Sequence, residues 1–233
     1  MSYRDSIALF SLMQPVRRRA GEGDPATAYA ARNVVALQSP GIAARRPGQA
    51  ACFGPGTLLA TPAGDVPATE LKAGDLVHTH DAGAQPIAWI NHVSVMGYGH
   101  DTPVTIDAGV LGNSAPLMVS QAQRLLIDDG ATELLFGTGA VLVTARDLLQ
   151  LPGVSVTPSP RITYTQVLLA NHQILVANGT RVESLFLDQR TLGCLDPVVR
   201  TALAPMQSCF GDSLAPCLSA NEAAVWCHYA RAA

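Results

Sequence analysis

Short runs of hydrophobic and polar residues, separated by Gly, Pro and Asp turns, fill the chain from Cys52 to about Asp188. Stretches such as "GTLLATPAG", "DLVHTHDAG" and "QPIAWINHVSV" follow one another at intervals of roughly 8–12 residues, a spacing typical of an all-β domain. Alternating strands and helices would need longer helical patterns between the strands. We therefore predict short paired strands throughout residues 52–188, including "ELLFGTGAVLVTA", with one helical turn at "ARDLLQL".

The two ends of the chain differ in composition from the segment between them. Residues 1–51 are rich in Ala, Arg, Gly and Pro, where "DPATAYAARNVVALQ" favours one helix and "SPGIAARRPGQAA" favours a linker. After residue 188 the chain becomes rich in Ala and Leu, and Ser219 with Glu222 predicts a capping box for a final helix. The expected organisation is an N-terminal appendage or linker at 1–51, a β domain at 52–188 and a small helical extension at 189–233.

Composition and charge narrow the classes of partner. The chain is 48% hydrophobic and 14% charged, with a net charge of −3, so electrostatics do not favour nucleic acid. No apolar run reaches the roughly 18–20 residues of a membrane span, and we expect no membrane partner. The first residues lack the arrangement of a secretory signal peptide. The location is therefore unknown, with the cytoplasm as the default expectation and export without a signal left open.

The cysteines do not form an obvious framework. Five is an odd number, and Cys52 stands far from the rest, which disfavours a disulfide scaffold and suggests a reducing compartment. The late group lacks any Cys-x₂-Cys pair, so we expect packing thiols and no metal site there. This group consists of Cys194, Cys209, Cys217, Cys227 and His228. His78 and His80 point to one face of a strand, where a solvated edge is the expectation. No cofactor motif is present.

The stretch "CFGPGTLLATPAGDVPATELKAGDLVHTHDAGAQPIAWI" resembles the start of a Hint domain, the Hedgehog/intein module, in its bacterial Hint_2 form. That form begins with Cys-Phe, followed by Gly-Thr, a Thr-Pro-x-Gly turn, a Glu-Leu pair, a Gly-Asp turn and a Trp. The matching positions are Cys52, Phe53, Gly56, Thr57, Thr61, Pro62, Gly64, Glu70, Leu71, Gly74, Asp75 and Trp89. Later stretches continue the resemblance to about residue 188. It implies an all-β, Hint-type horseshoe of short paired strands.

The resemblance also implies a chemistry. The thiol of Cys52 would attack the carbonyl of Ala51 and convert the peptide bond to a thioester, an N–S acyl shift. The acyl group would then pass to water, a thiol or another nucleophile. The substrate would be the chain's own N-terminal segment, and the acceptor is unidentified. Independently of the family, "GPG" after Cys-Phe prevents a helix from starting there, which disfavours a papain-like nucleophile.

Three further residues are candidates for the site. In related domains a Thr or Ser and a His three residues later assist the shift, and the matching positions here are Ser120 and Gln123. Glutamine can donate a hydrogen bond but cannot transfer a proton, and general acid–base catalysis is worth roughly 10²–10⁴-fold. We therefore expect attenuated processing. His172 matches the late histidine of the family and could orient the site or protonate the amine.

Full splicing is not expected. The His-Asn ending of inteins is absent, and Asn178-Gly179 favours a turn. Three hypotheses follow, and they leave open whether the chain is an enzyme. The first is a self-cleaving module acting at Ala51-Cys52. The second is a degenerate Hint fold that serves as a non-catalytic structural or interaction module. The third, a cysteine hydrolase using Cys52 and His172 in trans, is disfavoured by "GPG".

Overall fold

The computed structural model describes residues 47–204, 206 and 213–231. The helix expected at residues 24–38 and Cys209 lie outside these residues. The strands are β1 (Leu58–Thr61), β2 (Gly64–Pro67), β3 (Leu76–Thr79), β4 (Gly83–Gly97), β5 (Val104–Ile106), β6 (Leu117–Val119), β7 (Arg124–Ile127), β8 (Val141–Thr144), β9 (Val154–Val156), β10 (Ser159–Leu169), β11 (Ile174–Ala177) and β12 (Thr180–Glu183). The helices are η2 (Pro47–Gln49), η3 (Gly99–Asp101), α3 (Gly130–Phe136), η4 (Asp147–Gln150), α4 (Gln189–Cys194), α5 (Pro197–Leu203) and α6 (Ala220–Ala230).

The strands form two antiparallel sheets. The larger sheet has the order β10-β4-β3-β11-β12-β7-β8, with the β1–β2 hairpin attached through β11. The smaller sheet has the order β6-β5-β9. Neither sheet closes into a barrel. The prediction of an all-β fold with a helical C-terminal part is confirmed. Among the described residues, no helix has the length and hydrophobicity needed to cross a membrane.

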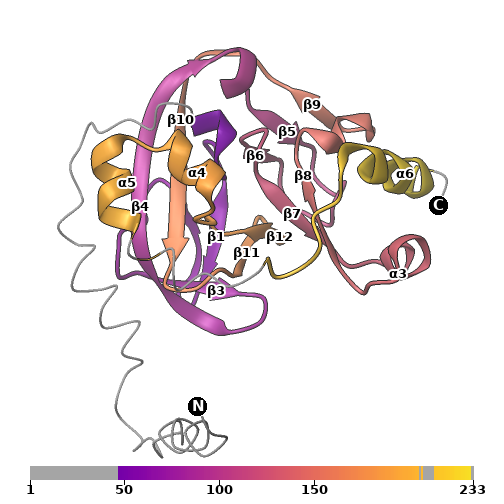
Figure 1. Cartoon of the computed structure of the whole chain (residues 1–233), viewed down its shortest axis with the longest axis horizontal. Coiled ribbons are helices and arrows are strands. Elements are labelled where there is room, and N and C mark those ends of the chain that lie inside the picture. Colours follow the sequence, from indigo (N-terminus) through magenta and orange to yellow (C-terminus); the bar gives the residue numbers. More distant parts are fainter. Residues whose placement is uncertain (1–46, 205, 207–212, 232–233) are drawn as a thin grey trace, which may run out of the picture.

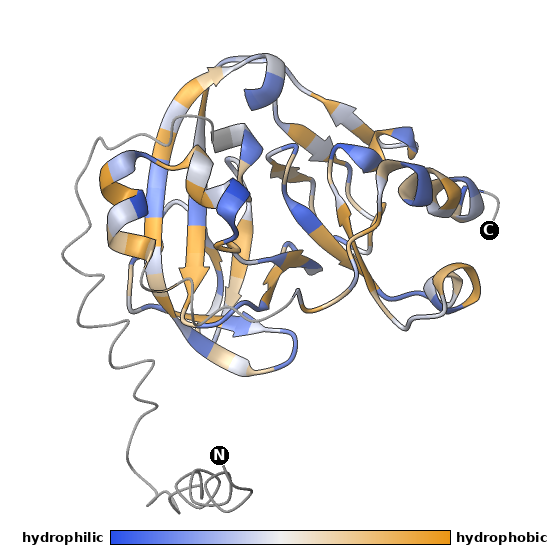
Figure 2. Cartoon of the chain, viewed as in Figure 1, coloured by the Kyte–Doolittle hydropathy of each residue, from blue (hydrophilic) through white to orange (hydrophobic). Residues whose placement is uncertain are grey.

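The long strands β4 and β10 pair along most of their length, and α4 and α5 cover one face of the pair (Figure 1). Trp89 and Tyr164 from the strands pack in one buried cluster with Leu192 and Val199 from the helices. Figure 2 shows hydrophobic positions interspersed with polar ones along these strands and helices, as expected for elements with one buried face. Cys52 belongs to this same cluster, so the helical extension helps to bury the candidate nucleophile.

A second buried cluster extends over the other strands and also includes residues of β4 and β10. The final helix α6 closes it with Ala223, Trp226 and Cys227 (Figure 1). The predicted capping box is confirmed, because the Ser219 side chain accepts from the Glu222 N–H while the Glu222 carboxylate accepts from the Ser219 N–H. The chain just before α6 also joins the edge of β8, where the Leu142 N–H donates to the Pro216 carbonyl at 2.8 Å.

One predicted strand is wrong. The first part of "ELLFGTGAVLVTA" forms α3, and only its second part forms β8. The carboxylate of Asp129 accepts hydrogen bonds from the N–H groups of Ala131 and Thr132, which caps the helix. Gly137 ends it in the left-handed conformation at φ 66°. These two local signals override the apolar run between them, whereas "ARDLLQL" forms the predicted helical turn, η4.

The Asn178-Gly179 turn is also confirmed. It joins β11 to β12 as a two-residue hairpin, and both residues have positive φ, 46° and 83°. The buried Asn178 side chain has a second role, because its Oδ1 accepts from the Leu58 N–H and its Nδ2 donates to the Pro116 carbonyl. The turn therefore ties β1 and the start of β6 to the same hairpin.

Candidate functional site

The segment that follows Cys52 is extended and lies between two strands. Phe53 exchanges two backbone hydrogen bonds of 2.8 Å with Thr165 on β10, and the Gly54 N–H donates to the Met118 carbonyl on β6 at 2.7 Å. A Cβ on Gly54 would lie 2.7 Å from Met118 Cγ and 2.9 Å from its carbonyl oxygen. Only glycine therefore allows this approach, and the backbone after Cys52 is held from both sides.

The segment that precedes Cys52 is anchored as well. The Gly48 N–H donates to the Asp101 carboxylate at 2.8 Å, which joins η2 to η3. A Cβ on Gly48 would lie 2.1 Å from the His100 carbonyl oxygen, so this contact also requires glycine. Ala50 is buried in the same apolar cluster as Cys52. The candidate scissile bond, Ala51-Cys52, is thus fixed at both ends.

Ser120, directly after β6, holds the backbone around this bond. The Cys52 N–H donates to Ser120 Oγ at 3.2 Å, and the Ser120 hydroxyl donates to the Ala50 carbonyl at 2.7 Å. The Ser120 N–H donates to the Cys52 carbonyl at 3.0 Å. Both residues are fully buried. One side chain therefore contacts the amide nitrogen that an acyl shift would release.

The Cys52 thiol lies in an apolar environment. Burial raises the pKa of this thiol well above its usual range, and a hydrogen bond from the Gln166 side chain only partly offsets the effect. The nearby carboxylate of Asp101 raises the pKa further. The resting thiol is therefore held in its protonated form. Gln166, a buried residue of β10, was not among the candidates from the sequence, although a polar residue within "TYTQVLLA" was a signal.

Gln123 follows Ser120 closely but its side chain is directed elsewhere. Its N–H donates to the Ser120 carbonyl at 3.1 Å, whereas its Nε2 donates to the carbonyls of Glu183 at 2.8 Å and Arg124 at 3.2 Å. Its Oε1 is buried and has no hydrogen-bond partner within the described part of the chain. The donor end of Gln123 is therefore committed to β12 and not to the amide of Cys52.

His172 belongs to a buried charged group centred on Glu183. His172 Nε2 lies 2.8 Å from Glu183 Oε1, and Arg124 Nε lies 2.9 Å from Glu183 Oε2. The Phe186 ring lies 4.4 Å from the His172 ring, and the Arg124 guanidinium carbon lies 5.5 Å from the centre of the Phe186 ring. Glu183 was not predicted from the sequence, where its only signal was an acidic residue directly before the apolar run "SLFL".

The four candidate residues therefore form two contact groups. Ser120 joins Cys52 directly, while the side chains of Gln123 and His172 both bond to Glu183. The backbone after Cys52 is extended and not helical, as "GPG" predicts.

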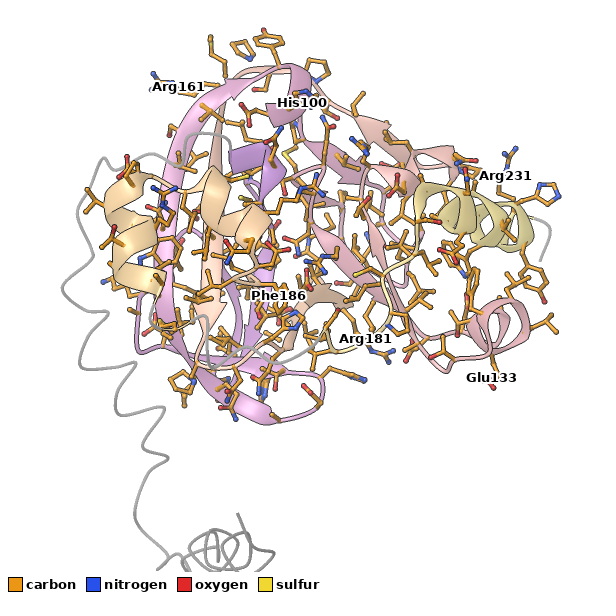
Figure 3. The ribbon with its side chains drawn as sticks, in the orientation of Figure 1. His100, Glu133, Arg161, Arg181, Phe186 and Arg231 are labelled. Carbon is orange, nitrogen blue, oxygen red and sulfur yellow. The ribbon has the colours of Figure 1, made fainter. Side chains whose placement is uncertain are left out.

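A cavity of about 530 Å³ opens beside the candidate scissile bond. Ala50 and Ala51 line one side, and Arg124, Glu183 and Phe186 line another. Figure 3 labels Phe186 near the middle of the molecule. The acyl side of the bond thus borders open space, whereas the thiol of Cys52 is fully enclosed.

The late cysteines lie in different environments. Cys194 packs in the cluster that contains Cys52, Cys227 lies on the buried side of α6 in the second cluster, and Cys217 is exposed beside the cavity. The Arg124 Nη1 donates to Cys217 Sγ at 3.0 Å. Within the described ranges, no group of three or more His, Cys, Asp or Glu side chains is placed to hold a metal ion.

Comparisons with solved structures give inteins and an intein-like domain. The intein-like domain from Clostridium thermocellum is 12% identical, with a TM-score of 0.40, and the match covers 57% of this chain and 97% of that chain. The MchDnaB-1 intein is 12% identical, with a TM-score of 0.38 and coverages of 57% and 98%. The DnaB intein from Synechocystis sp. is 9% identical, with a TM-score of 0.40 and coverages of 57% and 98%. No curated protein matches the chain.

The family model described as the Hint domain, in its Hint_2 form, matches residues 51–189. This match begins one residue before Cys52 and ends at the first residue of α4. It covers more than half of the chain, and it agrees with the resemblance carried by the opening motif. The protein is therefore a member of the Hint domain family.

Proposed function

We propose that this Hint domain carries out an N–S acyl shift at the Ala51-Cys52 bond and then transfers its own N-terminal segment to a separate nucleophile. In the first step the Cys52 sulfur attacks the Ala51 carbonyl, the C–N bond breaks, and the thiol proton ends on the released amino group. In the second step an acceptor replaces sulfur at the same carbonyl. Full splicing is not part of the proposal.

The observation that carries the proposal is the position of Ser120. Its hydroxyl accepts from the Cys52 N–H and donates to the Ala50 carbonyl, so one group orients the amide that must leave. The backbone bonds of Phe53 and Gly54 hold the other side of the bond. A fixed amide beside an adjacent thiol is the arrangement that proximity catalysis requires.

Two features make the proposed reaction slow. Burial raises the pKa of the Cys52 thiol, so little reactive thiolate exists near neutral pH. The Gln123 side chain cannot transfer a proton, and its donor group is bonded to the Glu183 carbonyl. The polar side chain that bonds to the leaving nitrogen is then the hydroxyl of Ser120, which does not readily transfer a proton. We expect cleavage over hours and not seconds.

A second candidate function is a non-catalytic structural module. The complete burial of Cys52 favours it, because α4 and α5 share the apolar cluster that encloses the thiol. Under this alternative the chain stays whole, and Cys52 serves as a small packing residue. The two candidates differ in one observable, which is whether a thioester forms at Ala51.

Hydroxylamine distinguishes them, because it cleaves thioesters at neutral pH and leaves ordinary amides intact. The acyl-shift proposal expects a fragment that ends in the hydroxamate of Ala51, and its absence in Cys52→Ala. Asn178-Gly179 offers a different sensitive bond, but the mass of that fragment identifies it. An intact Ala51-Cys52 bond at every hydroxylamine concentration would support the structural module.

A further inference from the structure

Several charged side chains line the cavity beside Ala51. It extends from the candidate scissile bond to the side chains of Arg146, Asp147, Asp188 and Arg190. An acceptor that reaches the Ala51 carbonyl from solvent must come through such a space, because the Cys52 side of the bond is enclosed. The charges that line the cavity therefore bear on which acceptor it admits.

The acidic groups of the cavity are already occupied. Glu183 pairs with Arg124 and His172. Asp188 caps α4, because its carboxylate accepts from the Thr191 N–H at 2.6 Å. Asp147 accepts from the hydroxyl of Thr144. These carboxylates are thus bonded to groups of the protein.

Two basic groups of the cavity are not occupied in this way. Arg146 and Arg190 are exposed, and neither forms an ion pair within the part of the chain that the structure describes. Arg124, by contrast, is committed to Glu183 and Cys217. Of the charged side chains that line the cavity, Arg146 and Arg190 are therefore the two without an ion pair or side-chain hydrogen bond within the described residues, and they are the groups that an anionic ligand would meet.

We propose that this cavity binds the acyl acceptor, and that the acceptor is a small anionic nucleophile, a thiol or amine that also carries a carboxylate or sulfonate. This inference rests on the proposed function. The anion would pair with Arg146 and Arg190, which places the nucleophilic end toward Ala51. The acceptor then attacks the thioester carbonyl, the bond from carbon to the Cys52 sulfur breaks, and the acceptor's proton passes to that sulfur.

The net negative charge of the chain makes a preference for anionic acceptors informative about particular side chains. With a net charge of −3, the protein as a whole repels anions, so a general electrostatic effect would favour neutral or cationic thiols. A local preference for anions must therefore come from particular side chains. Salt should weaken it, because the two guanidinium groups are exposed.

The test compares 2-mercaptoethanesulfonate with 2-mercaptoethanol at equal thiolate concentrations and low salt, on the full chain, with intact mass as the readout. We expect the sulfonate to cleave about fivefold faster, the effect of one solvent-exposed ion pair at the upper end of the usual range. The ratio should fall to about one in Arg146→Gln combined with Arg190→Gln. Arg161→Gln is the matched control, since this exposed arginine on β10 does not line the cavity (Figure 3). Equal rates for the two thiols, or a preference that survives the double substitution, would overturn the inference.

Cleavage by neither thiol would refute the proposed function, and the cavity is then tested by binding alone. Titration of the full chain with ethanesulfonate, followed by calorimetry, should give saturable binding that is lost in the double variant and kept in Arg161→Gln. No saturable binding, or binding unaffected by the double substitution, would refute the anion site itself.

Discussion

Substitution of Ser120 by alanine tests the central contact of the site. The change removes one hydroxyl and leaves two buried backbone groups, the Cys52 N–H and the Ala50 carbonyl, without their partner. Each buried group left unsatisfied costs about 1–3 kcal/mol. Water entering from the cavity beside Ala50 can satisfy part of this loss. We therefore expect the free energy of unfolding to fall by about 2–4 kcal/mol.

The assay is urea unfolding followed by tryptophan fluorescence, with all variants in a Cys52→Ala background so that no cleavage interferes. Ser114→Ala is the control, because the Ser114 hydroxyl also donates to a backbone carbonyl, that of Asn178 at 3.1 Å, but the residue is exposed. The control should lose about 0.5–1 kcal/mol. Equal losses for the two variants would refute the reasoning that Ser120 satisfies buried groups at the scissile bond.

Three further predictions concern the surroundings of this bond. Because burial raises the pKa of the Cys52 thiol, the folded chain keeps a proton that the unfolded chain releases above the ordinary pKa of 9.0. Above this pH the free energy of unfolding should fall by about 1.4 kcal/mol per pH unit relative to Cys52→Ser. Parallel curves for the two proteins from about pH 9 to pH 11 would contradict this. Glu183→Gln should lower the free energy of unfolding, measured in urea, by about 2–4 kcal/mol, because it removes a buried charge that pairs with Arg124. A decrease of less than about 1 kcal/mol would show that this pair does not stabilise the fold. Gly54→Ala should lower the melting temperature, because its Cβ meets Met118 at 2.7 Å, whereas Gly130→Ala, with no atom within 4 Å, should leave it unchanged or raise it. Equal shifts for the two glycine variants would mean that the approach of Gly54 to β6 is not tight.

The sequence predicted the features that depend on neighbouring residues. Turn residues and short β-rich runs indicated the strands, and Asn178-Gly179 indicated a hairpin that the structure contains. The final helix followed from its capping box at Ser219 and Glu222. The error at "ELLF" arose because the apolar run was weighed more heavily than the capping residues Asp129 and Gly137, which were present in the sequence.

Contacts that depend on strand register could not be predicted in the same way. Glu183 meets Arg124 and His172 only because β12 lies beside β7 and follows β11 in the sheet. Gln166 reaches Cys52 because Thr165 pairs with Phe53 across the sheet. Neither set of contacts could be predicted from the spacing of these residues along the chain. The resemblance to the family supplied Ser120 and Gln123 as positions, but not the direction in which the Gln123 amide is turned.

The most direct test of the acyl shift is the intact mass of the purified chain over time, with and without dithiothreitol, compared with that of Cys52→Ala. We expect slow loss of residues 1–51 that dithiothreitol accelerates and Cys52→Ala abolishes. Gln123→His, which restores a side chain able to transfer a proton, should speed this loss, by up to about 10²–10⁴-fold. A chain that keeps its full mass under all conditions, in both the wild type and Gln123→His, would contradict the acyl shift and leave a structural Hint domain.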